Sequence, residues 1–365
     1  MNRRKFLRTG ATAGVAAGSF LAAAPAISQD RHRWRFVTLW PKGLPGLADE
    51  FQIFADFVEK ASNGRLTIEI FGAGELVPAL ETIDAVQSGS AEMGHGAPYY
   101  WKGKVPAAQF LAGMPFGMIT QEMTAWYRYG GGQAIADEVY AEMNCKVFLG
   151  GNTGVQMGGW FNKEINTPED LAGLKIRMPG LGGEVLKAIG ANVVLMPGAQ
   201  TLTALQTGNI DAADWVGPFN DMAGGLYKAA KYYYYPGWHE PTTVLDLFVN
   251  QEAWAALDEE LQAVVTLGAG KLNDLIFSGY IARNDQALQT LTGEHGVVLK
   301  RFPDAVLTAL GKKSTEVISA IAKEDPLSEK VFNSIVAFRK GVKNWTTIST
   351  EAFLAARNLD IGEFA

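Results

Sequence analysis

Hydrophobic and polar positions follow two different periods along this chain, and the periods predict strands and helices in turn. Period-two runs and helical stripes alternate through the first hundred residues as strand, helix, strand, helix and strand, at residues 34–39, 48–61, 65–71, 82–87 and 91–96. The first helix carries its stripe at Phe51, Phe54, Phe57 and Val58. Such an alternation of strands and helices is typical of a mostly parallel α/β sheet.

The middle of the chain repeats this plan. Strands are predicted at 146–150, 174–178, 192–196 and 209–215, and helices from Thr167, at 182–189 and at 199–207. The segments 85–92 and 204–211 both run from a helix through a glycine into a strand, with Gly89 and Gly208 at the turns. The repeat predicts two similar lobes, each with its own sheet.

The last third of the chain is predicted to be helical. A long helical pattern covers residues 258–289, and a final amphipathic segment begins at Pro326. The apolar face of that final segment comprises Val331, Ile335, Val336 and Phe338, and Trp345 and Phe353 extend it. An exported protein would not leave this stripe in water, so it must pack against its own lobe or against a second copy of the chain. We predict the second outcome, a homodimer.

The first 28 residues have the composition of an export signal. A basic start at residues 1–8 precedes an apolar run rich in Gly and Ala, and the small residues Ala24-Pro25-Ala26 follow. The pair Arg3-Arg4 resembles the twin-arginine type of signal. The alternative is a membrane anchor, but the run is shorter than the roughly 20 apolar residues of a typical spanning helix. The predicted location is therefore the periplasm.

Charge and composition exclude several classes of function. The net charge is −6, and it becomes −10 (28 basic against 38 acidic groups) when the four basic leader residues are removed. An acidic chain disfavours nucleic acid and anionic membranes as partners. The single cysteine, Cys145, cannot form an internal disulfide and is predicted to be buried. The four histidines lack metal-ligand spacing, and no catalytic or nucleotide-binding motif is present, so we expect no enzyme.

Polar residues at four predicted strand ends stand out among aromatic and glycine-rich surroundings. They are Gln156, Arg177, Asp214 and Glu240. Ligands of α/β lobes bind at the carboxyl ends of strands, so these side chains are candidates for one common site.

Several runs of this sequence resemble those of one family. They are GELVP at 74–78, GGNTGVQMGGWF at 150–161 with EINT at 164–167, LKIR at 174–177, DWVGP at 214–218, YYYYPGW at 232–238 and NSIVAFR at 333–339. Together they resemble the DctP-like solute-binding subunits of tripartite ATP-independent periplasmic (TRAP) transporters. The subgroup that binds 2-oxo acids such as pyruvate is the most similar.

The resemblance implies a role for each candidate residue. Arg177 would pair with the substrate carboxylate, which a planar guanidinium can bind through two hydrogen bonds. A cation would be held by Gln156, Asp214, the backbone carbonyl of Trp215 and Glu240. Asp214 departs from the pattern, because the subgroup member compared carries Glu there, one methylene longer. Either Tyr99 or Tyr100, of which we favour Tyr100, would close the site from the first lobe.

A charge count supports the cation independently. Asp214, Glu240 and a substrate carboxylate contribute −3 and Arg177 returns +1, which leaves a costly buried surplus. The proposed ligands are all oxygens, and these suit a hard cation. The resemblance implies Na⁺ for this subgroup, whereas Ca²⁺ would neutralise the surplus more completely.

The sequence thus predicts a two-lobed fold like that of periplasmic binding proteins, with a ligand cleft between the lobes and a C-terminal helical extension. Lobe I would comprise 29–152 with about 243–290, lobe II 153–242 with about 291–325, and the extension 326–365. The expected function is capture of a small 2-oxo monocarboxylate and its delivery to TRAP membrane subunits by hinge closure. A receptor for a hydroxy acid such as lactate, with calcium, and an exported oxidoreductase remain as alternatives.

Overall fold

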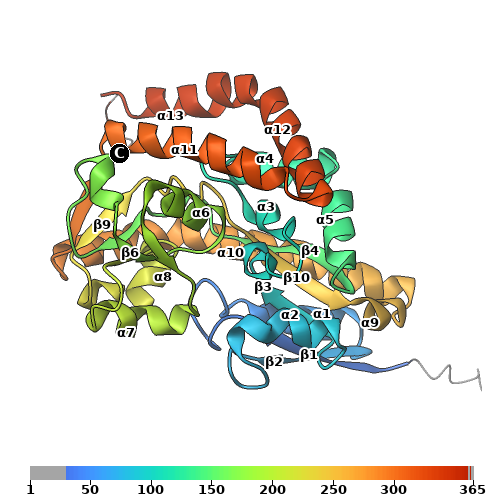
Figure 1. The fold of residues 1–365 in the computed structure, drawn as a ribbon. Helices are drawn as coiled ribbons and strands as arrows, with labels where there is room; N and C mark the ends of the chain where they lie inside the picture. Colours follow the sequence, from blue (N-terminus) through green and yellow to red (C-terminus); the bar gives the residue numbers. More distant parts are fainter. Residues whose placement is uncertain (1–29, 361, 363–365) are drawn as a thin grey trace, which may run out of the picture. The chain divides into compact units, whose positions relative to one another are not determined.

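The computed structural model describes residues 30–360 and 362, and the export signal predicted at residues 1–28 lies outside them. The chain divides into two units, Met1–Arg31 and His32–Ala365, and every element below belongs to the second. That unit is built from two sheets and the helices that cover them (Figure 1). None of the helices in the described part of the chain is long and apolar enough to cross a membrane.

The first sheet is mixed and has the strand order β2-β1-β3-β10-β4. Its strands are β1 (His32–Thr38), β2 (Leu66–Phe71), β3 (Met93–Gly96), β4 (Cys145–Asn152) and β10 (Val244–Asn250). β1 is parallel to β2 and β3, but β10 is antiparallel to both of its neighbours. The three strands from which a parallel sheet was predicted, β1, β2 and β3, are parallel, but the sheet as a whole is mixed, because β10 returns from a distant part of the chain and local periodicity carries no signal of that pairing.

The second sheet is also mixed and has the order β11-β9-β5-β8-β6-β7. Its strands are β5 (Gly159–Phe161), β6 (Lys175–Arg177), β7 (Asn192–Val194), β8 (Ala212–Ala213), β9 (Tyr232–Tyr235) and β11 (Val298–Arg301). β6 is parallel to β7 and β8, whereas β5 is antiparallel to β8 and β9. Because β6 and β8 are parallel neighbours, their carboxyl ends lie side by side.

Helices cover both sheets (Figure 1). They are α1 (Phe51–Ala61), α2 (Thr82–Gln87), α3 (Ala108–Ala112), α4 (Thr120–Tyr129), α5 (Gly132–Ala141), α6 (Gly180–Ile189), α7 (Thr201–Gln206), α8 (Pro218–Ala223), α9 (Gln251–Ala255), α10 (Glu259–Gly293), α11 (Asp304–Ala322), α12 (Pro326–Thr346) and α13 (Ala352–Arg357). The predicted stripe of α1 is buried at Phe51, Phe54 and Val58, where the helix packs against β2 and α10. α10 also contacts β4 of the first sheet and α8, the helix that follows β8 of the second sheet.

The predicted repeat is present in the structure. A 3-10 turn after a proline precedes each of the six-residue helices, η1 (Ala79–Glu81) before α2 and η4 (Gly198–Gln200) before α7. Each helix is then followed by a left-handed glycine, Gly89 or Gly208, where φ is 75° or 71°. By contrast, the helix predicted from Thr167 is only a 3-10 turn, η3 (Pro168–Leu171), which begins with a capping box formed by Thr167 and Asp170.

The chain crosses between the sheets where β4 ends and β10 begins, and polar groups bind these two crossing segments to each other. Thr153 N–H donates to the carbonyl of Thr243 at 3.1 Å, and the Asn152 side chain donates to Thr242 Oγ1 at 2.9 Å. Thr120, the first residue of α4, donates to Asn152 Oδ1 at 2.9 Å. We refer to residues 152–156 and 240–244 as the crossover.

The final helices lie together along one side of the molecule (Figure 1). The first half of α12 packs on its own chain, against α3, α4, α5 and α11, and buries Val331 and Ile335. A π-helical turn at Thr347–Glu351 joins α12 to α13. Beyond this packed half, the large apolar residues are exposed: Trp345 by 69%, Ile348 by 61% and Phe353 by 66%. The first half of the stripe therefore folds back on its own chain, whereas its extension beyond Phe338 is uncovered, and packing against a second copy stays a prediction.

Candidate functional site

The ends of two parallel strands bring Arg177 and Asp214 together. Arg177 is the last residue of β6, and Asp214 follows β8 directly. Because β6 and β8 are neighbours in register, Asp214 N–H donates to the Arg177 carbonyl at 2.9 Å. Arg177 Nη1 in turn donates to Asp214 Oδ2 at 3.2 Å and to the Asp214 carbonyl at 2.9 Å, and both side chains are only 1% exposed.

The remaining donors of Arg177 face away from Asp214. Nη2 donates to the Tyr100 hydroxyl at 2.7 Å, while Nε has no hydrogen-bond partner among the described residues. Burial alone would lower the pKa of Arg177, but Tyr100 and Asp214 outweigh it and the pKa is raised. The guanidinium is therefore charged, and Nε–H lies on the same edge of its plane as Nη2.

The segment after β9 adds two further ionisable groups. It passes through a cis Tyr235–Pro236 bond, and its residues His239 and Glu240 lie beside Asp214. His239 Nε2 lies 2.8 Å from Asp214 Oδ1. Burial lowers the pKa of His239, yet the charge of Asp214 more than compensates and the pKa is raised. Burial, followed by the charge of Asp214, raises the pKa of Glu240 to about 7.

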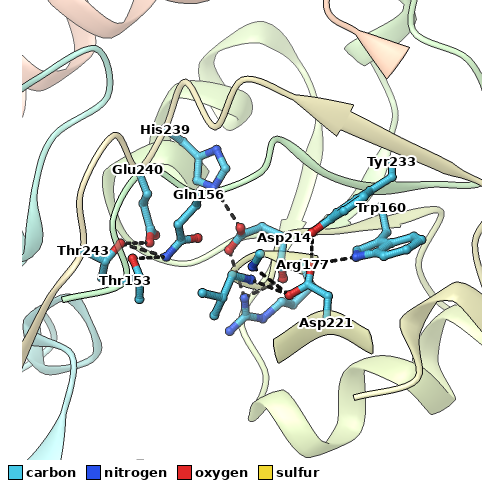
Figure 2. Close-up of polar contacts among 12 residues, drawn as sticks. Thr153, Gln156, Trp160, Arg177, Asp214, Asp221, Tyr233, His239, Glu240 and Thr243 are labelled. Carbon is cyan, nitrogen blue, oxygen red and sulfur yellow. Dashed lines mark hydrogen bonds and ion pairs between the residues drawn. The ribbon is translucent and has the colours of Figure 1, made fainter. Parts of the chain in front are cut away.

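The crossover supplies Gln156. Its backbone N–H donates to the Glu240 carbonyl at 3.1 Å, which fixes the two segments relative to each other. Its side-chain nitrogen donates to the hydroxyls of Thr153 and Thr243, whereas Oε1 is buried and has no partner within the described part of the chain. Figure 2 shows this oxygen on the side of Asp214.

Trp215 lies against Arg177, Trp40 and Gly198. Its ring is 5.2 Å from the guanidinium carbon and meets Trp40 edge-on at 6.2 Å. A Cβ on Gly198 would lie 1.7 Å from a ring atom, so only glycine leaves room for the indole there.

Asp221 fixes the backbone that follows Trp215. Its Oδ1 accepts the N–H groups of Val216 and Gly217, both at 3.0 Å. Its Oδ2 accepts Trp160 Nε1 and the Tyr233 hydroxyl, both at 2.8 Å (Figure 2). Burial raises the pKa of Asp221 to about 7.

The structure brings every predicted site residue to one place, since Gln156, Arg177, Asp214, Trp215, Glu240 and Tyr100 all lie in this cluster. Of the two candidate tyrosines, Tyr100 contacts Arg177, whereas Tyr99 packs against Gly180 and the ring of Tyr100. The sequence analysis missed His239, Thr153, Thr243 and Asp221. His239 also changes the charge count, because a proton on it would supply one of the missing positive charges.

The donor set fits a cation. Ligand atoms from Asp214, His239 and Glu240 lie within 4.8 Å of one another and all three residues are buried. Gln156 Oε1 adds a buried oxygen that has no partner among the residues the structure describes. Carboxylate and amide oxygens are the ligands that hard cations prefer, and the charge of a cation would offset the cost of burying two carboxylates.

Two α/β sheets joined by crossing segments, with a buried polar site at strand ends, define a solute-binding protein of the periplasmic type. Residues 38–325 match the family described as bacterial extracellular solute-binding protein, family 7 (DctP), and the chain belongs to this family. The sequence-based assignment of family and fold class is confirmed, and membership agrees with a location outside the cytoplasm.

Three relatives illustrate the similarity. A monocarboxylate 2-oxoacid-binding periplasmic protein from Nostoc sp. is 41% identical over 354 residues, which cover 96% of this chain and 97% of the relative. A TRAP periplasmic solute-binding protein from Pseudoalteromonas atlantica, solved with sodium and pyruvate, is 41% identical with a TM-score of 0.87, covering 89% of this chain and 99% of that one. Its counterpart from Colwellia psychrerythraea, solved with calcium and pyruvate, is 39% identical with a TM-score of 0.87, covering 90% and 100%.

Proposed function

We propose that this chain is the receptor of a TRAP transporter that captures a small 2-oxo monocarboxylate such as pyruvate together with Na⁺ or Ca²⁺. It releases the acid to membrane subunits and performs no chemistry on it. The relatives from Nostoc, Pseudoalteromonas and Colwellia support this proposal through the ligands that their descriptions name.

The observation that carries the proposal is the pairing of unused donors and acceptors in one buried cluster. Arg177 offers Nε–H and Nη2–H on one side, which can hold a carboxylate through two hydrogen bonds. Asp214, Glu240, Gln156 Oε1 and the carbonyl of Trp215 would hold the cation. An acid anion and a cation bound together leave the buried charge closer to neutral than either would alone.

The two sheets suggest how the site opens. We assign lobe I to 29–152 with about 243–290 and lobe II to 153–242 with about 291–325, so that the crossover acts as the hinge. Arg177 and Asp214 then belong to lobe II and Tyr100 to lobe I. Closing the lobes would bring the Tyr100 hydroxyl onto the guanidinium that holds the acid.

The C-terminal region, 326–365, would form a homodimer. The uncovered apolar residues Trp345, Ile348 and Phe353 need a partner, because only the first half of α12 is packed against its own chain. A cavity of about 340 Å³ lined by Phe116 and Ile318, among others, lies beside α11 and α12 and offers an apolar surface to a second copy. Export by the twin-arginine route would deliver the protein already folded.

A thermal-shift screen of the mature protein tests the function. Pyruvate, longer 2-oxo acids and lactate are added one at a time, each with Na⁺, with Ca²⁺ and after exhaustive chelation and desalting. Because a ligand that binds only the folded state raises the apparent melting temperature, we expect a rise with 2-oxo acids that needs one of the cations. A rise for pyruvate in demonstrably cation-free protein, or turnover of the acid, contradicts the proposal, and a larger rise for lactate reassigns the receptor to hydroxy acids.

A further inference from the structure

The side-chain amide of Gln156 is clamped between two buried threonines of the crossover. Its Nε2 donates to Thr153 Oγ1 at 3.1 Å and to Thr243 Oγ1 at 2.9 Å. The threonines are 3% and 1% exposed. Both hydrogens of the amide are therefore spent on the same side, away from Asp214 (Figure 2).

The hydroxyl hydrogens of the two threonines are also used in hydrogen bonds to other acceptors. Thr243 donates its hydrogen to Glu240 Oε2, and Thr153 donates to the carbonyl of Gly154 at 3.2 Å. A hydroxyl has a single hydrogen, so toward Gln156 both threonines can only accept. Only the NH₂ end of the amide can satisfy two acceptors, and the reverse orientation would place three oxygens together without a proton between them.

The consequence appears at the other end of the amide. Oε1 is buried, has no partner among the described residues and lies on the side of Asp214. A flipped amide would present its NH₂ group there and would repel a cation. Thr243 contacts both Gln156 and Glu240, so one hydroxyl fixes two of the proposed oxygen ligands.

We propose that Thr243, with support from Thr153, is a positioning residue that determines how tightly the site holds its cation. It keeps Gln156 Oε1 and Glu240 turned toward the cation while touching neither the cation nor the acid. This inference rests on the proposed function, because it assumes that the cluster binds a cation.

The neighbouring residue Thr242 offers a matched control. It is equally buried in the same crossover, and its hydroxyl bonds to Asn152 and Thr120 instead of to any predicted ligand. Thr242→Val therefore removes a buried hydroxyl from the hinge at the same depth and leaves Gln156 clamped.

The experiment titrates Ca²⁺ by calorimetry into metal-free mature protein without acid, and then titrates pyruvate at saturating Ca²⁺. Thr243→Val should weaken Ca²⁺ binding about ten- to a hundredfold, as expected when a group that orients a metal ligand is lost. Pyruvate affinity at saturating Ca²⁺ should stay within about threefold of the parent value, because Arg177 lies outside the altered contacts. Thr243→Ser, which keeps the hydroxyl, should restore Ca²⁺ binding, and Thr242→Val should bind Ca²⁺ like the parent.

Three results would overturn the inference: parent-like Ca²⁺ affinity in Thr243→Val, the same loss in Thr242→Val, or no rescue by Thr243→Ser. If Thr243→Val does not fold, Thr153→Val decides in its place, because it removes the second acceptor of the same amide. A parent protein that binds pyruvate with no Ca²⁺ or Na⁺ dependence refutes the proposed function itself, before any variant is compared.

Discussion

The three nitrogen atoms of the Arg177 guanidinium have different hydrogen-bond partners and therefore different roles in the site. Nη1 is occupied by Asp214 and Nη2 contacts Tyr100, while Nε remains available. Asp214 thus holds the guanidinium in one orientation without using the side that a carboxylate needs. A lysine at this position would have neither the planar shape nor enough directed donors to serve all these groups.

Arg177→Lys should therefore keep the fold but lose most of the affinity for the acid. The loss of a buried, charge-assisted pair costs roughly 2–5 kcal/mol, which is about 30-fold to several thousand-fold in affinity. Calorimetric titration with pyruvate at saturating cation measures this loss. The same substitution at the exposed Arg33, which pairs with Glu69 on the first sheet, is the control and should leave affinity unchanged. If the Arg177→Lys variant binds within about threefold of the parent, Arg177 is not part of the proposed carboxylate site.

His95 shows a different effect of burial on a single residue. Its Nδ1 accepts Trp40 Nε1–H at 3.2 Å and its Nε2 lies 3.1 Å from the carbonyl of Gly150. Both contacts are satisfied by the neutral ring, and a proton on Nδ1 would face the indole N–H. Burial accordingly lowers the pKa of His95 to about 3.

This lowered pKa predicts a loss of stability in mild acid. In the unfolded chain His95 binds a proton near pH 6.5, whereas in the folded chain it stays neutral down to about pH 3. The free energy of unfolding therefore decreases as the pH is lowered from about 6.5 to about 3. His95→Gln can keep both hydrogen bonds without titrating. Relative to this variant, the parent should lose about 2 kcal/mol of unfolding free energy between pH 7 and pH 5. Denaturant unfolding at several pH values measures the difference, and a constant gap between the two proteins would contradict it.

At the scale of elements, α12 combines two environments in one helix. Its first half fits into a surface formed by α3, α4 and α5, where Trp126 Nε1 donates to Ser334 Oγ at 3.1 Å and Phe338 lies against Gly130. The π-helical turn beyond it carries Ile348, which is 61% exposed. The buried apolar residues of α12, Val331 and Ile335, thus lie in its first half, whereas the end of the helix contributes a hydrogen bond from Thr346 to Glu122 of α4.

A pair of identical truncations separates the two halves. Ile335→Ala removes a side chain that is 1% exposed and should cost about 2–4 kcal/mol of unfolding free energy. Ile348→Ala should cost less than about 0.5 kcal/mol, provided that the measurement is made at a concentration where the chain is monomeric. Urea denaturation of both variants gives the comparison. Equal costs would show that the second half is packed against the same chain.

The sequence was most informative where an element is determined locally. The helix at Thr82–Gln87 has the predicted bounds, because its apolar positions and the glycine after it are adjacent in the chain. β8, by contrast, was predicted over seven residues and spans only Ala212–Ala213, and the residues directly after it, Asp214 and Trp215, belong to the site. β10 lies in the segment that was assigned to lobe I, but its antiparallel pairing with β3 and β4 could not be predicted, because these partners lie about a hundred residues or more away.

The same distinction applies to the site. Arg177 and Asp214 could be recognised because strand ends converge in any α/β sheet. Thr153 and Thr243 could not, because their importance comes from the pairing of two distant segments in the crossover. His239 is next to Glu240 in the sequence, and this adjacency to a predicted ligand was the signal that could have revealed it.

At the scale of the whole molecule, the uncovered C-terminal residues determine the expected assembly. A chain that ends at Asn344 keeps the packed part of α12 but lacks Trp345, Ile348 and Phe353. We expect the full mature protein to be a dimer at micromolar concentration and the shortened form to be a monomer with a similar capacity to bind pyruvate. Light scattering coupled to gel filtration measures both masses. A monomeric full-length protein refutes the dimer, and a dimeric shortened form moves the interface elsewhere.

Tyr100 is the one predicted site residue supplied by the first sheet's side, from the turn Pro98–Trp101 that follows β3. The other groups come from the second sheet or the crossover and contact one another, so in the proposed closure most of the site would be assembled before Tyr100 arrives. Acid and cation would then enter quickly, and the tyrosine would act afterwards by slowing their dissociation. Tyr100→Phe should leave the association rate constant unchanged and raise the dissociation rate constant about ten- to a hundredfold, the value of one hydrogen bond to a charged group. Stopped-flow tryptophan fluorescence separates the two constants, and a slower association step would show that Tyr100 helps to recruit the acid.

A receptor that releases its ligand to a membrane partner must not hold that ligand too long. In this arrangement a single hydroxyl would adjust the residence time of the ligand, independently of the rate of capture.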